Sequence, residues 1–141
     1  MTPRALLEEV TARWVADPDS DVVWAGDHEG RWGIRMRQQA RDFTTVWFDV
    51  GERTLGYEAY VIPAPAHNRQ EVFRQCLVRN RSGWRVHFAL DSEGGIYLRG
   101  RTPVATVEAA ELDAIVGAIY EAIEVSFRSL IAAGSMREKK P

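Results

Sequence analysis

The sequence predicts a two-layer α+β sandwich, in which helices cover one face of a mostly antiparallel five-stranded sheet. Two observations lead to this fold class. Strand-like segments follow one another without an intervening helix, first as a set of three and then as a pair, so hairpins connect them. A helical pattern precedes each set, and the longest apolar helical stripe comes last. The predicted order is α-βββ-α-ββ-α.

Composition narrows the class further. The chain has 141 residues, of which 45% are hydrophobic and 27% charged, as in one ordinary globular domain. Its one cysteine, Cys76, excludes an internal disulfide framework and a cysteine-cluster metal site. No apolar run approaches the ~20 residues that span a bilayer, and the N-terminus lacks the apolar stretch of a signal peptide. We therefore expect a cytoplasmic protein with no membrane contact.

The first helix is expected at the N-terminus. Thr2 offers an N-cap oxygen, and Pro3 suits the first turn, where a missing N–H costs nothing. Apolar residues follow at helical spacing until Asp17-Pro18 ends the run. Residues 22–24 are predicted to form a short extended piece and residues 26–30 a turn, and neither is counted as a strand of the sheet.

Residues 31–37, 43–50 and 54–62 are the first three predicted strands, because apolar residues alternate with polar ones along them. Pro63 ends the third strand, since proline cannot donate to a strand ladder. The side chains expected to face the core are Trp32, Ile34, Met36, Val46, Phe48, Val50, Leu55, Tyr57, Ala59 and Val61.

Asn68 and Glu71 have the spacing of a capping box and predict a short helix that residues 80–83 close. Its buried stripe is expected to consist of Val72, Phe73, Cys76 and Leu77. Residues 84–90 and 96–101 are the last two predicted strands, joined by the glycine-rich turn at 91–95. In the first of these, Trp84, Val86, Phe88 and Leu90 are expected to point inward.

The longest helix is predicted over about 107–133, with Thr106 as its cap and Gly134 as its stop. Residues 1–134 then form a single domain, and residues 135–141 a flexible tail. The large side chains expected to be mostly buried are Trp32, Phe48, Trp84, Phe88, Ile119, Ile123 and Phe127.

Three stretches of this pattern resemble a known family: residues 43–80, residues 88–104 and the long helix with Glu111-Leu112-Asp113 near its start. Together they resemble the YbjN family of bacterial sensory transduction regulators, whose fold is similar to that of class I type III secretion chaperones. The likeness is greatest to the actinobacterial branch, in the segments Pro63 to Asn80 and Tyr97 to Pro103. The resemblance implies a chaperone-like fold with no enzyme activity, catalytic residue or cofactor. It also implies a homodimer that binds extended segments of partner proteins.

No residue pattern supports an enzyme. Asp27-His28-Glu29 are adjacent on a turn and are interpreted as surface residues rather than as ligands of one metal ion. His67 and His87 are interpreted as solvated loop and strand residues, and Cys76 as core packing. Phosphate-binding glycine loops and nucleophile-elbow motifs are missing from the sequence. We therefore expect neither catalytic residues nor a metal.

Arginines are concentrated in the middle of the chain, where residues 31–101 hold twelve Arg against seven acids. Arginine mixed with aromatic rings is typical of protein-binding faces and, less favoured here, of single-stranded nucleic acid binders. The net charge of −2 also disfavours a nucleic-acid partner. The candidate partner- or anion-binding face on the outer side of the sheet is Arg35, Arg37, Trp47, Tyr60, Arg85, Tyr97, Arg99 and Arg101.

A second apolar row on the longest helix, Val116, Tyr120, Ile123 and Phe127, is the candidate dimer interface. The row could instead pack on the N-terminal helix, and a sheet edge could pair the two copies in its place. The function predicted from the sequence is a non-catalytic chaperone-like or regulatory protein-interaction module that acts as a homodimer. The alternative is a regulator that senses a small ligand or nucleotide and holds its anion through sheet arginines.

Overall fold

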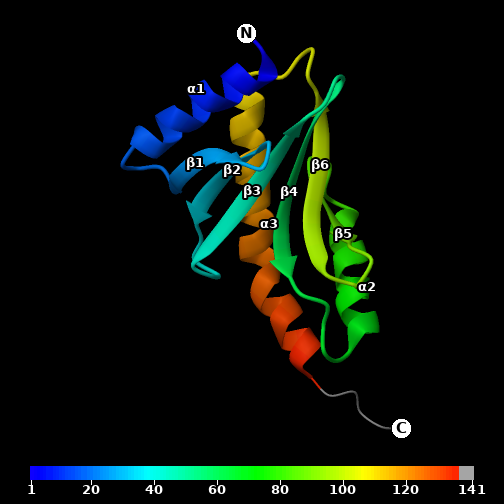
Figure 1. Cartoon of the computed structure of the whole chain (residues 1–141). Coiled ribbons are helices and arrows are strands. Elements are labelled where there is room, and N and C mark those ends of the chain that lie inside the picture. The colour runs from blue at the N-terminus through cyan, green and yellow to red at the C-terminus, as the bar shows by residue number, and fades with distance from the viewer. Residues whose placement is uncertain (137–141) are drawn as a thin grey trace, which may run out of the picture.

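The computed structural model describes residues 1–136, which form one six-stranded sheet and three helices (Figure 1). The elements in chain order are α1 (Pro3–Ala16), β1 (Val22–His28), β2 (Arg31–Arg37), β3 (Phe43–Val50), β4 (Thr54–Ile62), α2 (Arg69–Asn80), β5 (His87–Leu90), β6 (Ile96–Pro103) and α3 (Ala109–Ser135). The strand order is β1-β2-β3-β4-β6-β5, and every neighbouring pair is antiparallel. The predicted α+β architecture with an antiparallel sheet is confirmed.

The prediction of five strands was wrong, because β1 is a full strand. It pairs with β2 from Val22 opposite Met36 to His28 opposite Arg31. The hairpin turn consists of only Glu29 and Gly30, whose φ angles are 52° and 82°. Two residues with positive φ make a tight turn that suits the twist of a hairpin. The strand therefore continues through Gly26, where the sequence suggested a turn.

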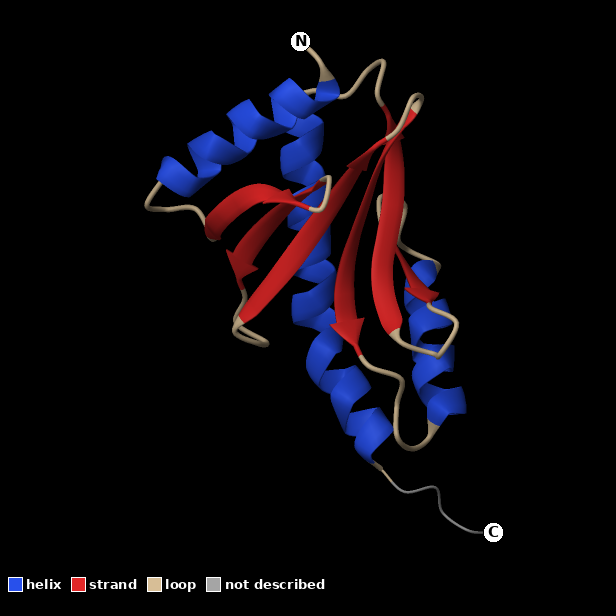
Figure 2. Ribbon diagram, in the orientation of Figure 1, coloured by secondary structure: helices blue, strands red, loops and turns tan. Residues whose placement is uncertain are grey.

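All three helices lie on the same face of the sheet (Figure 2). Trp32, Phe48 and Tyr57 lie opposite one another on β2, β3 and β4 and so share this face. The Trp32 indole donates to Thr11 Oγ1 of α1 at 3.2 Å, which fixes α1 on that side. α3 runs behind the sheet and α2 lies beside α3 (Figure 1). Within residues 1–136 no helix covers the opposite face, which we call the open sheet face.

The predicted core is confirmed at its centre and wrong at one edge. Phe48, Ile119 and Ile123 are buried, and Trp32, Phe88 and Phe127 pack partly buried against them. Trp84, however, is 71% exposed. β5 begins only at His87, so residues 84–86 precede the strand and their side chains do not follow its alternation.

Three other predicted inward positions are also wrong, and one of them is Val50, the last residue of β3, which is 44% exposed. Leu90, the last residue of β5, is 49% exposed, and Leu77 of α2 is 70% exposed. The buried side of α2 is narrower than the apolar stripe of its sequence, because only Val72 and Cys76 are fully buried. A short helix beside a short edge strand has little sheet against which to pack a wider stripe.

The helix ends differ in how well their caps were predicted. Thr2 Oγ1 accepts from the Ala5 N–H at 3.1 Å, as expected. Asn68 precedes α2 but has a left-handed conformation, with φ at 56°, and forms no side-chain cap. Its amide instead donates to the Ala133 carbonyl at 3.4 Å, which joins the start of α2 to the end of α3.

α3 begins at Ala109 rather than near 107, and its N-cap residue Glu108 makes no side-chain cap bond. The helix continues one residue beyond Gly134, to Ser135. The prediction of a flexible tail over 135–141 therefore fails at Ser135, and residues 137–141 lie outside the described residues.

The loop between β2 and β3 is fastened to α3 by one carboxylate. Glu124 Oε2 accepts hydrogen bonds from the Gln38 side-chain amide at 2.6 Å and from the Gln39 and Ala40 backbone N–H groups at 3.0 Å. Burial alone would raise the pKa of Glu124, but the three hydrogen bonds together hold it below its ordinary value. Glu124 therefore stabilises this loop as an anion.

Candidate functional site

The open sheet face has a flat floor made of two paired glycines. Gly26 of β1 lies opposite Gly33 of β2, and Gly33 lies opposite Trp47 of β3. A Cβ placed on Gly33 would lie 2.6 Å from Trp47 Cζ3 and 3.0 Å from Trp24 Cζ3. A Cβ placed on Gly26 would lie 2.8 Å from Trp24 Cζ2. Both indole rings therefore lie against glycine backbone, at positions where any side chain would collide with them.

Trp24 reaches this position because β1 is irregular. The register between β1 and β2 shifts between Val22 and Trp24, as at a β-bulge. Bulges change the direction in which a strand residue points. Trp24 remains 40% exposed, although the glycine floor lies beneath it.

Beside the two tryptophans is a hollow of about 540 Å³, lined by Val23, Trp24, Arg35, Phe43, Thr45 and Trp47. The Arg35 guanidinium carbon lies 4.1 Å from the centre of the Phe43 ring, a cation–π distance. We call this region the aromatic hollow. Its walls offer large apolar rings with one cation, so it suits an apolar side chain of a binding partner.

Ion pairs neutralise much of the charge along the centre of the open face. Arg31 donates to both carboxylate oxygens of Asp49 at 2.9 Å and to Glu58 at 2.7 Å. The hydrogen bond from Arg31 to Asp49 is the main reason that the pKa of Arg31 is raised. Arg99 pairs with the other oxygen of Glu58 at 3.3 Å. Glu58 is thus held between two cations, and neither is a free anion site.

A second, more polar groove of about 710 Å³ crosses β4, β6 and β5 on the same face. Glu58, Arg99 and Arg101 line it. Tyr60 and Tyr97 form an edge-to-face pair on neighbouring strands, with ring centres 5.5 Å apart. The open face thus combines an aromatic hollow on β1–β3 with a charged groove and a tyrosine pair on β4–β6.

The strand register places seven of the eight predicted face residues on the open face: Arg35, Arg37, Trp47, Tyr60, Tyr97, Arg99 and Arg101. Arg85 is the exception, because it precedes β5 instead of lying in it. Its guanidinium pairs with Glu111 at the start of α3 at 3.2 Å and lies over the Trp84 ring at 3.8 Å. Arg85 therefore belongs to the edge between the two layers.

The predicted dimer row on α3 does not form an exposed surface. Ile123 is fully buried and Val116 is nearly so, because both face the sheet. Phe127 packs under the Arg41 guanidinium, 5.3 Å from it. Tyr120 alone of the four retains an accessible, partly buried ring without such a cover. The row therefore belongs to the protomer's own core or packs against it.

Sequence reasoning missed Trp24, Gly26, Gly33 and Phe43 as members of the face. A signal was present, because Gly26 and Gly33 each occur inside a strand-like segment of this aromatic-rich hairpin. It was not recognised because residues 26–30 were assigned to a turn. A glycine inside a strand indicates a close approach of some other group.

The histidines and the cysteine do not converge on a reaction centre. His28 lies at the hairpin end, where the neighbouring Asp27 pairs with Arg4 at 2.6 Å. Burial raises the pKa of the Cys76 thiol to about 11, so it is not an activated nucleophile. Within residues 1–136, no group of three His, Cys, Asp or Glu side chains is placed to hold a metal ion. No helix among the same residues is long and apolar enough to cross a membrane.

Comparison with known proteins gives a family match over most of the chain. The model of the YbjN family, described as "Putative bacterial sensory transduction regulator", matches residues 8–132. An uncharacterized protein of Mycobacterium leprae is 37% identical over 101 residues, which are 72% of this chain and 55% of that protein. One of Mycobacterium tuberculosis is 38% identical over 85 residues, which are 60% of this chain and 46% of that protein. The chain therefore spans about half the length of these relatives.

Two solved structures share the fold. A chain in the crystal structure of the ExsC–ExsE complex superposes with a TM-score of 0.65 and 18% identity, covering 92% of this chain and 97% of its own. A chain in the heterodimeric ExoU–SpcU complex, from the type III secretion system of Pseudomonas aeruginosa, gives a TM-score of 0.53 and 15% identity, with coverages of 90% and 96%. The two likenesses show a shared fold, and they agree with the fold that the family resemblance predicted.

Proposed function

Because the chain belongs to the YbjN family and has a chaperone-like fold, we propose that it is a non-catalytic protein-interaction module. In this proposal a partner polypeptide binds across the open sheet face. The aromatic hollow takes an apolar side chain of the partner, and the charged groove takes polar and charged groups beside it.

The observation on which the proposal depends is that aromatic rings lie on a sheet face that no helix of residues 1–136 covers. An antiparallel sheet with one face in water normally carries polar residues there. This face instead exposes Trp24, Phe43 and Tyr60 by about two fifths each. Tryptophan, tyrosine and arginine are the residues that contribute most to protein–protein affinity. Protein partners also fit the structural neighbours, which are complexes of one protein with another.

The alternative, in which sheet arginines hold a small anion, has weaker support. Asp49 and Glu58 together already pair with Arg31 and Arg99, and the Arg35 guanidinium lies on the Phe43 ring. Arg37 and Arg101 have no carboxylate within 4.0 Å among residues 1–136, but they lie on different strands, on opposite sides of Trp47 and its neighbours. Separate arginines of this kind attract acidic segments of a protein as well as they attract a small anion.

Site-specific photo-crosslinking in cells tests the proposal. Tyr60 is replaced by p-benzoylphenylalanine, a photoreactive aromatic residue whose added benzoyl group would project from the open face. The matched control places the same residue at Glu9, on the exposed side of α1. We expect a discrete crosslinked protein from position 60, lost when Trp24 and Trp47 are both changed to serine. Crosslinks from position 9 alone would contradict the proposal.

We also propose that the protein forms a homodimer, through α2 rather than α3. Leu77 and Val78 are neighbours on the exposed side of α2, at 70% and 57% exposure. Leu90 lies on β5 beside this helix, because Asn80 of α2 hydrogen-bonds to Phe88 of the same strand. Two adjacent exposed aliphatic residues on a short helix are a small apolar patch that a second copy could cover by two-fold symmetry.

The Asn80 side chain also argues against pairing of β5 strands between two copies. It donates to the Phe88 carbonyl at 3.1 Å and accepts from the Phe88 N–H at 2.7 Å. These two backbone groups of the short edge strand therefore already have hydrogen-bond partners and are not available to a second copy. Sedimentation of Leu77→Glu tests the α2 interface. We expect the variant to be monomeric where the wild type is dimeric. A wild type that stays monomeric at micromolar concentrations would contradict the dimer.

A further inference from the structure

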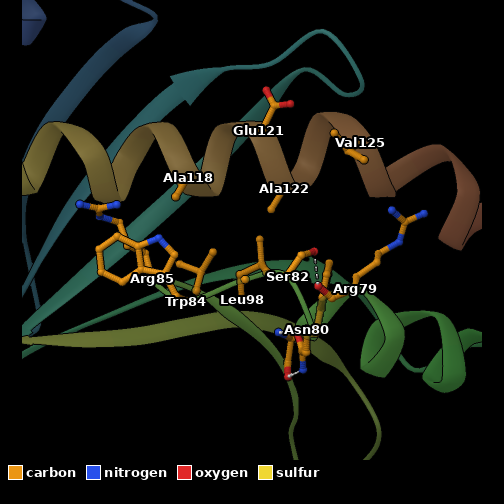
Figure 3. A pocket seen from close by; sticks show the side chains of 13 residues that line it. Arg79, Asn80, Ser82, Trp84, Arg85, Leu98, Ala118, Glu121, Ala122 and Val125 are labelled. Atoms are coloured by element: carbon orange, nitrogen blue, oxygen red, sulfur yellow. Dashed lines mark hydrogen bonds between the residues drawn. The ribbon is translucent and has the colours of Figure 1, made fainter.

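A separate cavity lies on the helix side of the sheet, between α3 and the segment that joins α2 to β5 (Figure 3). Its volume is about 350 Å³, more than twice the ~150 Å³ cavity that is known to hold benzene. The walls are mainly apolar. Ala118 and Ala122 point into it from α3, and Val86, Phe88 and Leu98 line it from the sheet side.

The cavity exists because α3 presents small side chains at this point. Ala118 and Ala122 are one helical turn apart and so lie on the same side of α3. Residues 81–86 form no strand, so they pass beneath α3 without closing the space. Trp84 does not fill it either, because its ring stacks on Arg85 and is mostly exposed.

Two arginines stand at opposite ends of the cavity (Figure 3). The Nε atoms of Arg79 and Arg85 are both buried, and neither has a hydrogen-bond partner among residues 1–136. Both residues line the cavity, so each places a guanidinium cation at one of its ends.

The two ends differ in charge. Arg85 already has the Glu111 carboxylate at 3.2 Å and the Trp84 ring at 3.8 Å. Arg79 has no carboxylate within 4.0 Å among residues 1–136. Glu121 also lines the cavity, but its carboxylate points away from the interior (Figure 3). The unsatisfied positive charge is therefore at the Arg79 end.

We propose that this cavity binds an amphipathic carboxylate, with the carboxylate on Arg79 and an apolar chain or ring extending toward Trp84. The Arg79 guanidinium lies at one end of the cavity without a carboxylate partner among residues 1–136, so it suits the carboxylate of a ligand, and the mainly apolar walls suit a short alkyl chain or a ring. The site is distinct from the open sheet face, which lies on the other side of the sheet. It would make the protein responsive to a small molecule while leaving the proposed partner face free.

The test measures binding of octanoate, octan-1-ol and octylammonium by isothermal titration calorimetry and by ¹⁵N NMR shifts of the Gly83 and Trp84 backbone amides. We expect octanoate to bind at least about tenfold more tightly than octan-1-ol, because hydrogen bonds to a charged group are stronger than neutral ones. Octylammonium should bind most weakly. Equal affinities for the three probes, or no octanoate binding below its micellar concentration, would overturn the proposal.

Variants separate the two parts of the site. Arg79→Met keeps an unbranched apolar stem, removes the charge, and should reduce octanoate affinity to that of octan-1-ol. Ala122→Leu fills the cavity and should abolish binding of both. Gly117→Ala is the control on the same helix, since a Cβ there meets nothing within 4 Å and the residue does not line the cavity. Octanoate binding that survives Arg79→Met and Ala122→Leu unchanged would place the ligand elsewhere and refute the assignment.

Discussion

The paired-glycine floor gives the sharpest prediction, because Gly33→Ala should change the open sheet face without unfolding the protein. The added Cβ would lie 2.6 Å from Trp47 Cζ3, so the indole must retreat by about 1 Å to reach an ordinary contact distance. Trp47 is the residue directly opposite Gly33 on β3. The substitution therefore moves the Trp47 ring by adding a methyl group beneath it, and leaves the tryptophan itself in place.

Two opposing effects set the change in stability. Burying a whole tryptophan removes ~150–250 Å² from water, worth about 4–6 kcal/mol, and the half-buried Trp47 therefore gains about half of that. A shift of ~1 Å forfeits part of this packing, about 1 kcal/mol. Replacing glycine by alanine within a strand stabilises the folded state by roughly 0.5–1 kcal/mol, because alanine loses less chain entropy on folding. The free energy of unfolding should therefore change by less than about 1 kcal/mol.

Partner affinity should respond more strongly than stability. Tryptophans at interface centres contribute about 2 kcal/mol or more, which is roughly 30-fold in the dissociation constant. Urea unfolding measures the stability of Gly33→Ala, and biolayer interferometry measures its affinity for the crosslinked partner. Gly117→Ala is the control, because its new Cβ contacts nothing. Unchanged partner affinity, or a loss of stability above about 3 kcal/mol, would refute the reasoning about the glycine floor.

Three further predictions concern the fold. The folded-state pKa of Glu124 lies below its ordinary value, so its stabilising effect is complete above the unfolded pKa of about 4.3 and is lost as the pH falls through the lower folded value. Glu124→Gln should therefore be less stable than wild type at neutral pH by about 1–2 kcal/mol in urea unfolding, with the difference shrinking in acid; a constant difference down to pH 2 would contradict this. Gly100→Ala should cost about 3 kcal/mol or more, since the added Cβ would overlap the Arg85 carbonyl oxygen and the Tyr57 ring, and a melting temperature equal to that of wild type would show that this approach is looser. The Cys76 thiol, with its pKa raised to about 11, should react with iodoacetamide at pH 8 far more slowly in the folded protein than in urea, and equal rates would show that it is not buried.

The sequence predicted most of the fold because its strongest patterns are those that secondary structure imposes. Alternation along residues 31–37, 43–50 and 54–62 predicted β2, β3 and β4 with the observed bounds. The apolar stripe of the last helix predicted α3 to within two residues at each end. Family resemblance then supplied the chaperone-like architecture, which local pattern alone does not determine.

The errors occur where local pattern gives little information. β1 was truncated because Gly26 was interpreted as a turn residue, whereas its missing side chain makes room for the Trp24 ring. Trp84 was placed inside because it is large and apolar, but no strand forms at that position. The apolar width of α3 was assigned to a dimer, although Ile123 faces the protomer's own sheet. Each of these depends on tertiary contacts between segments distant in sequence.

The candidate face was only partly predictable. Period-two alternation placed Trp47 and four of the five arginines on the outer side of the sheet, where the register has them, whereas Arg85 lies outside the strands. The pairing of Gly26 with Gly33 could not be predicted without the β1–β2 register, because neither glycine alone defines a floor. The hydrogen bonds that Arg31 donates to Asp49 and Glu58 depend on the same cross-strand geometry.

The central claim is that a protein partner binds on the open sheet face, and the most direct measurement is the affinity of that partner for three forms of the protein. These are the wild type, the double variant Trp24→Ser/Trp47→Ser, and Leu77→Glu, which changes an exposed apolar residue outside this face. The double variant should weaken partner binding by at least about 30-fold, as expected for two central aromatic residues, while Leu77→Glu should retain the affinity of each protomer. Equal affinity of the double variant and the wild type would contradict the claim that this face is the binding site.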